Sequence, residues 1–471
     1  MSASRITALV LLFLAYRQLY HYLGPHGTGQ QQFVLSFVTI FGVVIDFGIQ
    51  QYIVKKMSEE PGRVKNYFHQ YLAISSLLSV LVYITMLVVA KLGNYEPVLF
   101  YAIAVAGLGI VVSAVTYPFL AVLSAFQDLG KVALINFLNS MVNVAIIVLT
   151  VVFHRYIVFL VSVQPLAALL NLILYTRYVK KYLPQPGYSQ VFAALDGPMV
   201  RGMAKAVLPF ALLVGFSTIY NRIDVVIITH ILGFDQNGIY AAAYKFFDLV
   251  AFFPAVVSHS LYPMFAGLMA RQAILEVRLN IEKYLRFLMA VAIPMGVAGS
   301  LLARPMILLL TNDIRYIDAA PVLAIMVWAP VALIIYIVAN SLIISQLTKF
   351  AVMITAANVV INVAGNLILL PRIGIRGAAI MTVVSEVVQG VFYFYFIRKK
   401  ITDFSFFSFL WRPALASAVM GGALYFIRSH GFFISVVGGS VVYVAALLLL
   451  GFFERGDWEF AKQFFRPRAA A

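Results

Sequence analysis

The sequence predicts an all-α polytopic membrane protein with about fourteen transmembrane helices. Of its 471 residues, 63% are hydrophobic and only 11% are charged, whereas a soluble domain carries about 25% charge. The mean hydropathy is +0.95. Because a helix needs about 20 apolar residues to cross a bilayer, the spans are expected near residues 5–23, 32–54, 68–90, 97–122, 132–153, 156–177, 204–231, 239–266, 284–303, 319–344, 350–370, 377–397, 408–428 and 432–453.

The first apolar stretch is expected to be a retained helix. It contains Arg17 and Gln18, and no small-residue cleavage site precedes Pro25, so it differs from a cleaved signal peptide. The chain has no cysteine, which excludes disulfides and thiolate metal sites. Among the connections, residues 266–279 are either an amphipathic surface helix or a plain connector.

The positions of the basic residues predict the orientation of the chain. With the N-terminus in the cytoplasm, 24 of the 34 Lys and Arg residues fall on the cytoplasmic side, 7 fall outside and three lie within spans. Such a bias is typical of cytoplasmic loops. It predicts a multi-pass protein of the cytoplasmic (inner) membrane with both termini inside the cell. It also explains the net charge of +16 without a nucleic-acid partner.

Two landmarks occur twice in the same order, which predicts a duplicated half. Leu23-Gly24-x4-Gly29 returns 209 residues later as Leu232-Gly233-x4-Gly238. Asn139-Ser-Met-Val-Asn143 returns 219 residues later as Asn358-Val-Val-Ile-Asn362. In membrane transporters such repeats form two bundles around a transport path. The expected domains are an N-lobe with spans 1–6 (1–182), a cytoplasmic linker (183–203), a C-lobe with spans 7–12 (204–400), and spans 13 and 14 with a cytoplasmic tail (401–471).

Charged residues inside spans are the strongest candidates for function, because each costs about 2.5–3.5 kcal/mol on insertion scales unless it is paired or wet. Arg222 and Asp224 are about 200° apart on a helix, so each needs another partner. Lys245 and Asp248 share one helix face, as an ion pair or as part of a site. The full set comprises the bases Arg17, Arg222 and Lys245 and the acids Asp46, Asp224, Asp248 and Glu386.

The basic residues suggest an anionic substrate. A guanidinium presents a fixed fork of donors that matches phosphate oxygens. Tyrosines crowd the same segments and suit the apolar faces of sugar rings, although interfacial tyrosines are common in membrane proteins. We therefore expect Arg17, Arg222 and Lys245 to bind substrate together with Tyr16, Tyr20, Tyr220 and Tyr244, and the four acids to couple transport to an ion.

Enzyme signatures are missing, so we expect a protein that is not an enzyme and that has no cofactor and no metal site. The chain contains no Gly-x4-Gly-Lys-[Ser/Thr] phosphate loop and no His-Glu-x-x-His motif. Two asparagine stripes, Asn136/Asn139/Asn143 and Asn358/Asn362/Asn366, each lie on one helix face. Such stripes pack helices together or face a lumen.

Several of these stretches carry a family resemblance. The chain resembles the polysaccharide transporter branch of the multidrug/oligosaccharidyl-lipid/polysaccharide (MOP) exporter superfamily over nearly its whole length. The resemblance is carried by Tyr22-Leu-Gly-Pro-His-Gly-Thr-Gly29, the stretch from Phe33 to Asp46-Phe-Gly48, Val54-Lys-Lys, Tyr220-Asn-Arg-Ile-Asp224, Leu232-Gly-Phe-Asp-Gln-Asn-Gly-Ile-Tyr240-Ala-Ala-Ala-Tyr244-Lys245 and Leu261-Tyr-Pro263.

That resemblance implies a Wzx-type (O-antigen) oligosaccharide flippase. Such proteins move polyprenyl-diphosphate-linked oligosaccharides from the inner to the outer leaflet, by alternating access of two six-helix lobes arranged in a V around a cationic cavity. It implies that Arg17, Arg222 and Lys245 bind the diphosphate or acidic sugars. Membrane potential, H⁺ or Na⁺ would drive the cycle, and spans 13 and 14 would hold the lipid tail. The implied partners are the lipid-linked oligosaccharide, the bilayer and glycan polymerase or ligase machinery.

Three other functions are compatible with the sequence to different degrees. A lipid II flippase would share the fourteen spans, whereas a multidrug exporter of the same superfamily would have twelve spans and an acidic, aromatic cavity. The four intramembrane acids nearly balance the three bases, which leaves the charge of the cavity open. A membrane glycosyltransferase or ligase would need a substantial outer loop, and the outer connections here are short.

Overall fold

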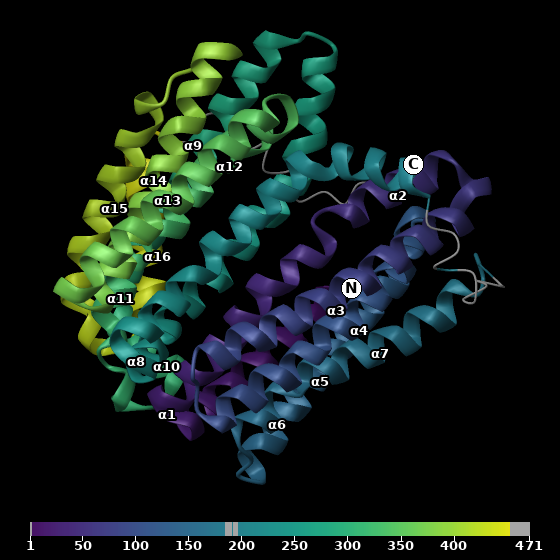
Figure 1. Cartoon of the computed structure of the whole chain (residues 1–471). Helices are drawn as coiled ribbons and strands as arrows, with labels where there is room; N and C mark the ends of the chain where they lie inside the picture. Colours follow the sequence, from purple (N-terminus) through teal and green to yellow (C-terminus); the bar gives the residue numbers. More distant parts are fainter. Residues whose placement is uncertain (1, 184–190, 192–195, 453–471) are drawn as a thin grey trace. The chain divides into compact units, whose positions relative to one another are not determined.

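The computed structural model describes residues 2–183, 191 and 196–452, and every regular element in these ranges is a helix (Figure 1). The predicted all-α class is confirmed. Part of the predicted linker 183–203 and most of the predicted tail after the last span lie outside the described residues.

The helices vary widely in length, from a three-residue 3₁₀ turn to a helix of 74 residues. In chain order they are α1 (Ser2–Asp46), α2 (Ile49–Glu59), η1 (Pro61–Arg63), α3 (Val64–Leu92), α4 (Pro97–Ala125), α5 (Leu129–Val152), α6 (Ile157–Val161), α7 (Val163–Val179), α8 (Gly197–Ala270), α9 (Ile274–Leu301), α10 (Ala303–Thr311), η3 (Ile314–Tyr316), α11 (Ala319–Met326), α12 (Trp328–Gln346), α13 (Thr348–Ile373), α14 (Ile375–Lys400), α15 (Phe407–Ile427), η4 (Arg428–His430) and α16 (Phe432–Leu449).

The predicted number of spans agrees with the helix lengths. Twelve segments of the described residues are long and apolar enough to cross a membrane. Two of them, Leu12–Glu59 with 48 residues and Val200–Ala251 with 52, have about twice the length that one crossing needs. Each double segment is interrupted by a glycine with non-helical dihedral angles. Counted as two spans each, they bring the total to the fourteen expected.

Some expected boundaries differ from the structure. The segment 266–279 is no separate surface helix, because α8 continues to Ala270 and α9 already begins at Ile274. The expected span 156–177 is divided into α6 and α7, and 319–344 is divided into α11 and α12. Membrane helices extend beyond the apolar stretch into the aqueous layer, where hydropathy no longer marks the helix end.

The described chain groups into two compact units, and each is described by itself. Unit 1 comprises the residues up to Ala242 with Leu308–Asp318 and Thr348–Met381. Its core includes aromatic side chains of α3 and α4. The rings of Phe68 and Phe119 pack edge to face there, with their centroids 4.9 Å apart. Gly109 of α4 lies against the backbone of Gln164 and Pro165 in α7, which allows close packing. The predicted lobe boundaries stay a prediction.

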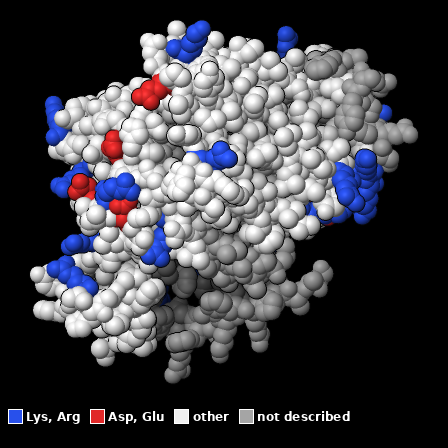
Figure 2. Space-filling view, turned by 90° about the horizontal axis from the view of Figure 1, so that it is seen from below, with Lys and Arg blue, Asp and Glu red and all other residues white. Residues whose placement is uncertain are grey.

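Unit 2 comprises Ala243–Ile307, Ala319–Leu347 and the described residues from Thr382 onward. Its core joins α9, α15 and α16 through Met420, Leu424 and Tyr443, and the Tyr443 hydroxyl donates to Ala290 O at 2.6 Å. Large apolar side chains such as Leu449 are exposed in both units. Figure 2 shows a face on which charged side chains form a few small groups and most described atoms are uncharged. The exposed apolar side chains of both units are suited to contact with lipid.

Candidate functional site

The two copies of the Leu-Gly-x4-Gly repeat break the two long helices at equivalent positions. Gly24 in α1 has φ 64° and ψ 180°, and Gly233 in α8 has φ 83° and ψ 178°. Side chains disfavour this left-handed backbone, so glycine is the residue that permits it. In the first copy Pro25 follows the break, and proline has no N–H to donate. The carbonyl of His21, four residues earlier, therefore loses its helical partner.

The second glycine of each copy lies against the backbone of the other copy. A Cβ on Gly29 would lie 1.9 Å from Phe234 O, and a Cβ on Gly238 would lie 1.8 Å from Pro25 O. The two contacts are equivalent, because the repeat offset of 209 residues relates Gly29 to Gly238 and Pro25 to Phe234. His26 Nδ1 and Asp235 Oδ2, which are themselves 209 positions apart, lie 3.1 Å from each other. We call this local two-fold contact the glycine crossing.

A second segment closes over the broken end of α1. Residues 308–318, which we call the strap, group with unit 1. Arg315 Nη2 donates to His21 O at 2.9 Å and thus replaces the donor that Pro25 lacks. The Tyr316 hydroxyl donates to Tyr20 O at 3.2 Å and lies 2.6 Å from the Thr28 hydroxyl. The strap therefore bonds to α1 on both sides of the Gly24 break.

The strap also reaches the predicted substrate-binding arginine in α1. Arg17 Nη2 donates to Asn312 Oδ1 at 2.7 Å, and its buried Nε has no hydrogen-bond partner among the described residues. Beside it, the rings of Tyr16 and Tyr20 are 6.4 Å apart. Tyr20 itself is 2% exposed, and its ring packs edge-on against that of Tyr316 with the ring centroids 5.6 Å apart. Arg17 thus retains donors that its protein neighbours do not use.

Asp313 and Arg315 form the charged pair of the strap. Arg315 Nη2 lies 2.6 Å from Asp313 Oδ2, and the Arg315 backbone N–H donates to Asp313 Oδ1 at 2.9 Å. Burial works to raise the pKa of Asp313, but the hydrogen bonds and charge of Arg315 outweigh it, so the pKa lies below its ordinary value. The hydrogen bond to Asp313 likewise raises the pKa of Arg315. Both side chains are therefore charged at neutral pH.

Asp46, a predicted ion-coupling residue, lines a cavity of about 310 Å³ within unit 1. The cavity has a mixed lining that also includes Thr39, Ser113 and Gln164. Asp46 Oδ1 accepts hydrogen bonds from the Tyr71 hydroxyl at 2.6 Å and from Gln50 N at 2.9 Å. These donors are neutral, and no ion pair to Asp46 occurs among the described residues. A proton or a metal cation would compensate its charge.

Two further predicted acids are buried and accept from tyrosine as well. Asp224 is 4% exposed and accepts from the Tyr240 hydroxyl at 3.1 Å and from Asn366 Nδ2 at 2.8 Å. Asn366 also donates to Asn362 at 3.0 Å, so one asparagine stripe faces the carboxylate in α8. In unit 2, Glu386 accepts from the Tyr336 hydroxyl at 2.5 Å.

The remaining predicted residues fall into both units. Arg222 and Tyr220 are half-buried in the unit 1 part of α8, and Arg222 has no ion pair among the described residues. In the unit 2 part of α8, Lys245 is half-buried, Asp248 is exposed, and Tyr244 packs on Phe247 with ring centroids 5.1 Å apart.

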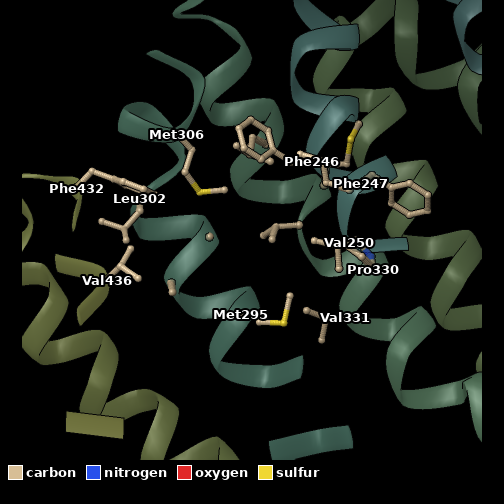
Figure 3. Close-up of a pocket in the computed structure, with 16 residues that line it drawn as sticks. Phe246, Phe247, Val250, Met295, Leu302, Met306, Pro330, Val331, Phe432 and Val436 are labelled. Carbon is tan, nitrogen blue, oxygen red and sulfur yellow. The ribbon is translucent and has the colours of Figure 1, made fainter. Parts of the chain in front are cut away.

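Unit 2 also contains an apolar cavity of about 240 Å³. It is lined by residues of α8, α9, α10, α11, α12 and α16. Figure 3 shows Phe432 and Val436 of α16 on one side and Val250 and Val331 on the opposite side. The lining includes no charged residue, so the cavity suits a hydrocarbon chain.

Sequence reasoning missed the strap and the tyrosine donors. The pattern Asn312-Asp313-x-Arg315 is visible after an apolar stretch, and Asn and Asp there indicate a helix end. The partner of that segment in α1 is about 295 residues away, however, and no local signal identifies it. The tyrosine donors Tyr71 and Tyr336 were likewise indistinguishable from other tyrosines in the spans.

Comparisons with known proteins agree with this architecture. The sequence profile of the family described as polysaccharide biosynthesis protein matches residues 2–269. No curated protein matches the chain.

Solved structures share the fold at low sequence identity. Lipid II flippase MurJ, in an inward closed conformation, is 13% identical with a TM-score of 0.73, and 99% of each chain is covered. An inward-facing multidrug resistance MATE family transporter of the MOP superfamily is 13% identical with a TM-score of 0.68, covering 83% of this chain and 94% of that one. A MOP superfamily transporter from Pyrococcus furiosus is 14% identical with a TM-score of 0.58, covering 84% and 92%.

Proposed function

Since the chain belongs to the polysaccharide biosynthesis protein family, we propose that it is a flippase for polyprenyl-diphosphate-linked oligosaccharide, moving it from the cytoplasmic to the outer leaflet. The observation that carries the proposal is Arg17, a half-buried guanidinium whose protein partner is a neutral amide and whose Nε has no partner among the described residues. A diphosphate supplies the oxygen acceptors and the negative charge that this group lacks.

The other predicted basic residues extend the same proposal. Arg222 and Lys245, with Tyr16, Tyr20, Tyr220 and Tyr244, would contact the diphosphate or the sugars. Tyr20 and Tyr244 are buried in the state described, so their contact with substrate would require a rearrangement during the transport cycle. Arg222 is half-buried without an ion pair among the described residues, which supports its availability to an anion.

We propose that Asp46 couples transport to H⁺ or Na⁺. It lines a cavity with a mixed polar lining and accepts hydrogen bonds from neutral donors. Asp224, Asp248 and Glu386 are the further candidates from the same set. A coupled charge that crosses the membrane yields about 2.3 kcal/mol per 100 mV.

Alternating access would use the glycine crossing as the closure on the outer side. With both termini in the cytoplasm, the two repeat loops lie outside, and their mutual contact would have to separate before a glycan could leave. The apolar cavity of unit 2 would hold part of the polyprenyl tail, because α16, the fourteenth span, contributes to its lining. The products would pass to glycan polymerase or ligase machinery.

The test is transport of lipid-linked oligosaccharide in cells that lack the native protein. Wild type should restore outer-leaflet delivery, and Arg17→Ala and Arg222→Ala should each reduce the rate at least about tenfold, as expected for loss of a charged hydrogen bond. Lys91→Ala, which removes an exposed cation, is the matched control. Full transport by both arginine variants at equal membrane abundance would reject this substrate path.

A lipid II flippase is the second candidate. It is favoured by the coverage of 99% of both chains in the comparison with MurJ, whereas the MATE comparison covers 83% of this chain. Both candidates share a polyprenyl-diphosphate lipid. Competition between purified lipid II and a lipid-linked oligosaccharide in reconstituted vesicles would separate them.

A further inference from the structure

The strap offers two oxygen-bearing side chains in succession, one neutral and one charged. Asn312 accepts from Arg17, whereas Asp313 accepts from the side chain and the backbone of Arg315. His21 Nδ1 lies 4.0 Å from the same Asp313 carboxylate. The negative charge of Asp313 is thus paired with Arg315, and the neutral oxygen of Asn312 is bound to Arg17.

The backbone explains why the neutral residue stands at this position. α10 ends at Thr311, and Asn312 has φ 51°, with its N–H bonded to Leu308 O at 2.9 Å. Asparagine tolerates this left-handed conformation at a helix end. Arg315 and Tyr316 then attach the strap to α1 independently of Arg17. The position of Asn312 beside Arg17 is therefore set by bonds that Arg17 does not make.

A neutral acceptor has a specific consequence for the guanidinium. Arg17 has five N–H donors, and one of them is bonded to Asn312. An amide oxygen orients the group but leaves its positive charge uncompensated. A carboxylate at the same place would form an ion pair and would repel an incoming anion.

We propose that Asn312 is a positioning residue that orients Arg17 for a diphosphate while preserving its charge. This inference rests on the proposed role of Arg17 in substrate binding. Asn312 acts through Arg17, and its neutrality makes the site selective for an anionic lipid headgroup over an uncharged one.

The test uses Asn312→Asp, a nearly isosteric change that keeps the tolerance for a left-handed backbone. Binding of farnesyl diphosphate to the full-length protein in nanodiscs is measured by calorimetry, with farnesol as the uncharged probe. We expect Asn312→Asp to weaken farnesyl diphosphate binding at least about tenfold and to flatten its dependence on ionic strength. Asn312→Gly, which removes the amide but allows the same φ, should weaken binding about two- to fivefold and retain the salt dependence.

The control is Asn94→Asp, the same substitution at another helix end, where φ is 49°. It should bind like wild type. If Asn312→Asp also binds like wild type, while Arg17→Ala loses binding, the inference about Asn312 is overturned and the proposed role of Arg17 stands. If Arg17→Ala binds as tightly as wild type, the proposed site itself is rejected together with the inference.

Discussion

Replacing both glycines of the crossing by alanine tests whether the two repeat loops form a closure that must separate. The added Cβ atoms of Gly29→Ala and Gly238→Ala would lie 1.9 Å and 1.8 Å from Phe234 O and Pro25 O. A carbon and a carbonyl oxygen approach to about 3.3 Å. The two backbones would therefore have to separate by about 1.4 Å, which is too much for side-chain adjustment because both obstacles are backbone atoms.

The size of the effect follows from this overlap. Overpacking of this kind costs about 1–3 kcal/mol. If the cost falls only on the closed state, the ratio of closed to open molecules drops by about 5- to 150-fold. The double-alanine variant would then populate the open state more than wild type does. Because alternating access requires both states, its transport should be slower.

The native chain has no cysteine, so the assay can use a single engineered pair. His26→Cys with Asp235→Cys replaces side chains that lie 3.1 Å apart across the crossing. Oxidative cross-linking of this pair in native membranes should be fast in the glycine background and at least about fivefold slower with both alanines. The matched control is Gly267→Ala in α8, where an added Cβ meets nothing within 4 Å. Equal cross-linking rates in the double-alanine and control proteins would show that the added Cβ atoms do not force the two loops apart.

Three further predictions follow from the polar groups and the cavity. Asp46→Asn should abolish the dependence of vesicle transport on an imposed ion gradient, whereas Tyr71→Phe, which removes one neutral donor, should reduce it only partly; an unchanged gradient response in Asp46→Asn would remove this residue from coupling. Because the pKa of Asp313 is lowered in the folded protein, its contribution to stability is present above the ordinary aspartate pKa of about 3.9 and is lost as the pH falls through the lower folded value. The Tm of wild type in detergent should therefore exceed that of Asp313→Asn at pH 6, with the difference shrinking below about pH 4; a constant difference would contradict the role of this ion pair. Ala298→Phe, which adds a ring to the cavity of about 240 Å³, should slow transport of long polyprenyl lipids more than that of a short farnesyl analogue, and equal slowing of both would argue against a tail site.

Much of the architecture was predictable because it depends on local composition. Apolar stretches of about 20 residues can satisfy their backbone hydrogen bonds in a bilayer only as helices. The expected spans accordingly match helices such as α3, α4 and α13. The first glycine of each repeat copy, Gly24 and Gly233, is the residue at which a long helix breaks. Helix ends were less accurate, as α9 shows, because hydropathy does not report the end of a helix in water.

The candidate site was likewise predictable only in part. Its charged residues stood out because a charge inside a span is costly, and this holds for Arg17, Asp46 and Asp224 without any knowledge of their neighbours. Their partners did not stand out. Nothing in the sequence distinguished Asn312 from other exposed asparagines, or Tyr71 from other tyrosines in the spans.

The all-α class, the approximate spans and the repeated glycine motifs were thus predictable, since they depend on local hydropathy and local sequence pattern. The contacts of Gly29 with Phe234, of Gly238 with Pro25 and of Arg17 with Asn312 of the strap are visible only in the folded chain. The residues in these three contacts are 205 (234 − 29), 213 (238 − 25) and 295 positions apart along the chain. Contacts at such separations depend on the packing of all the intervening helices, which no local pattern specifies.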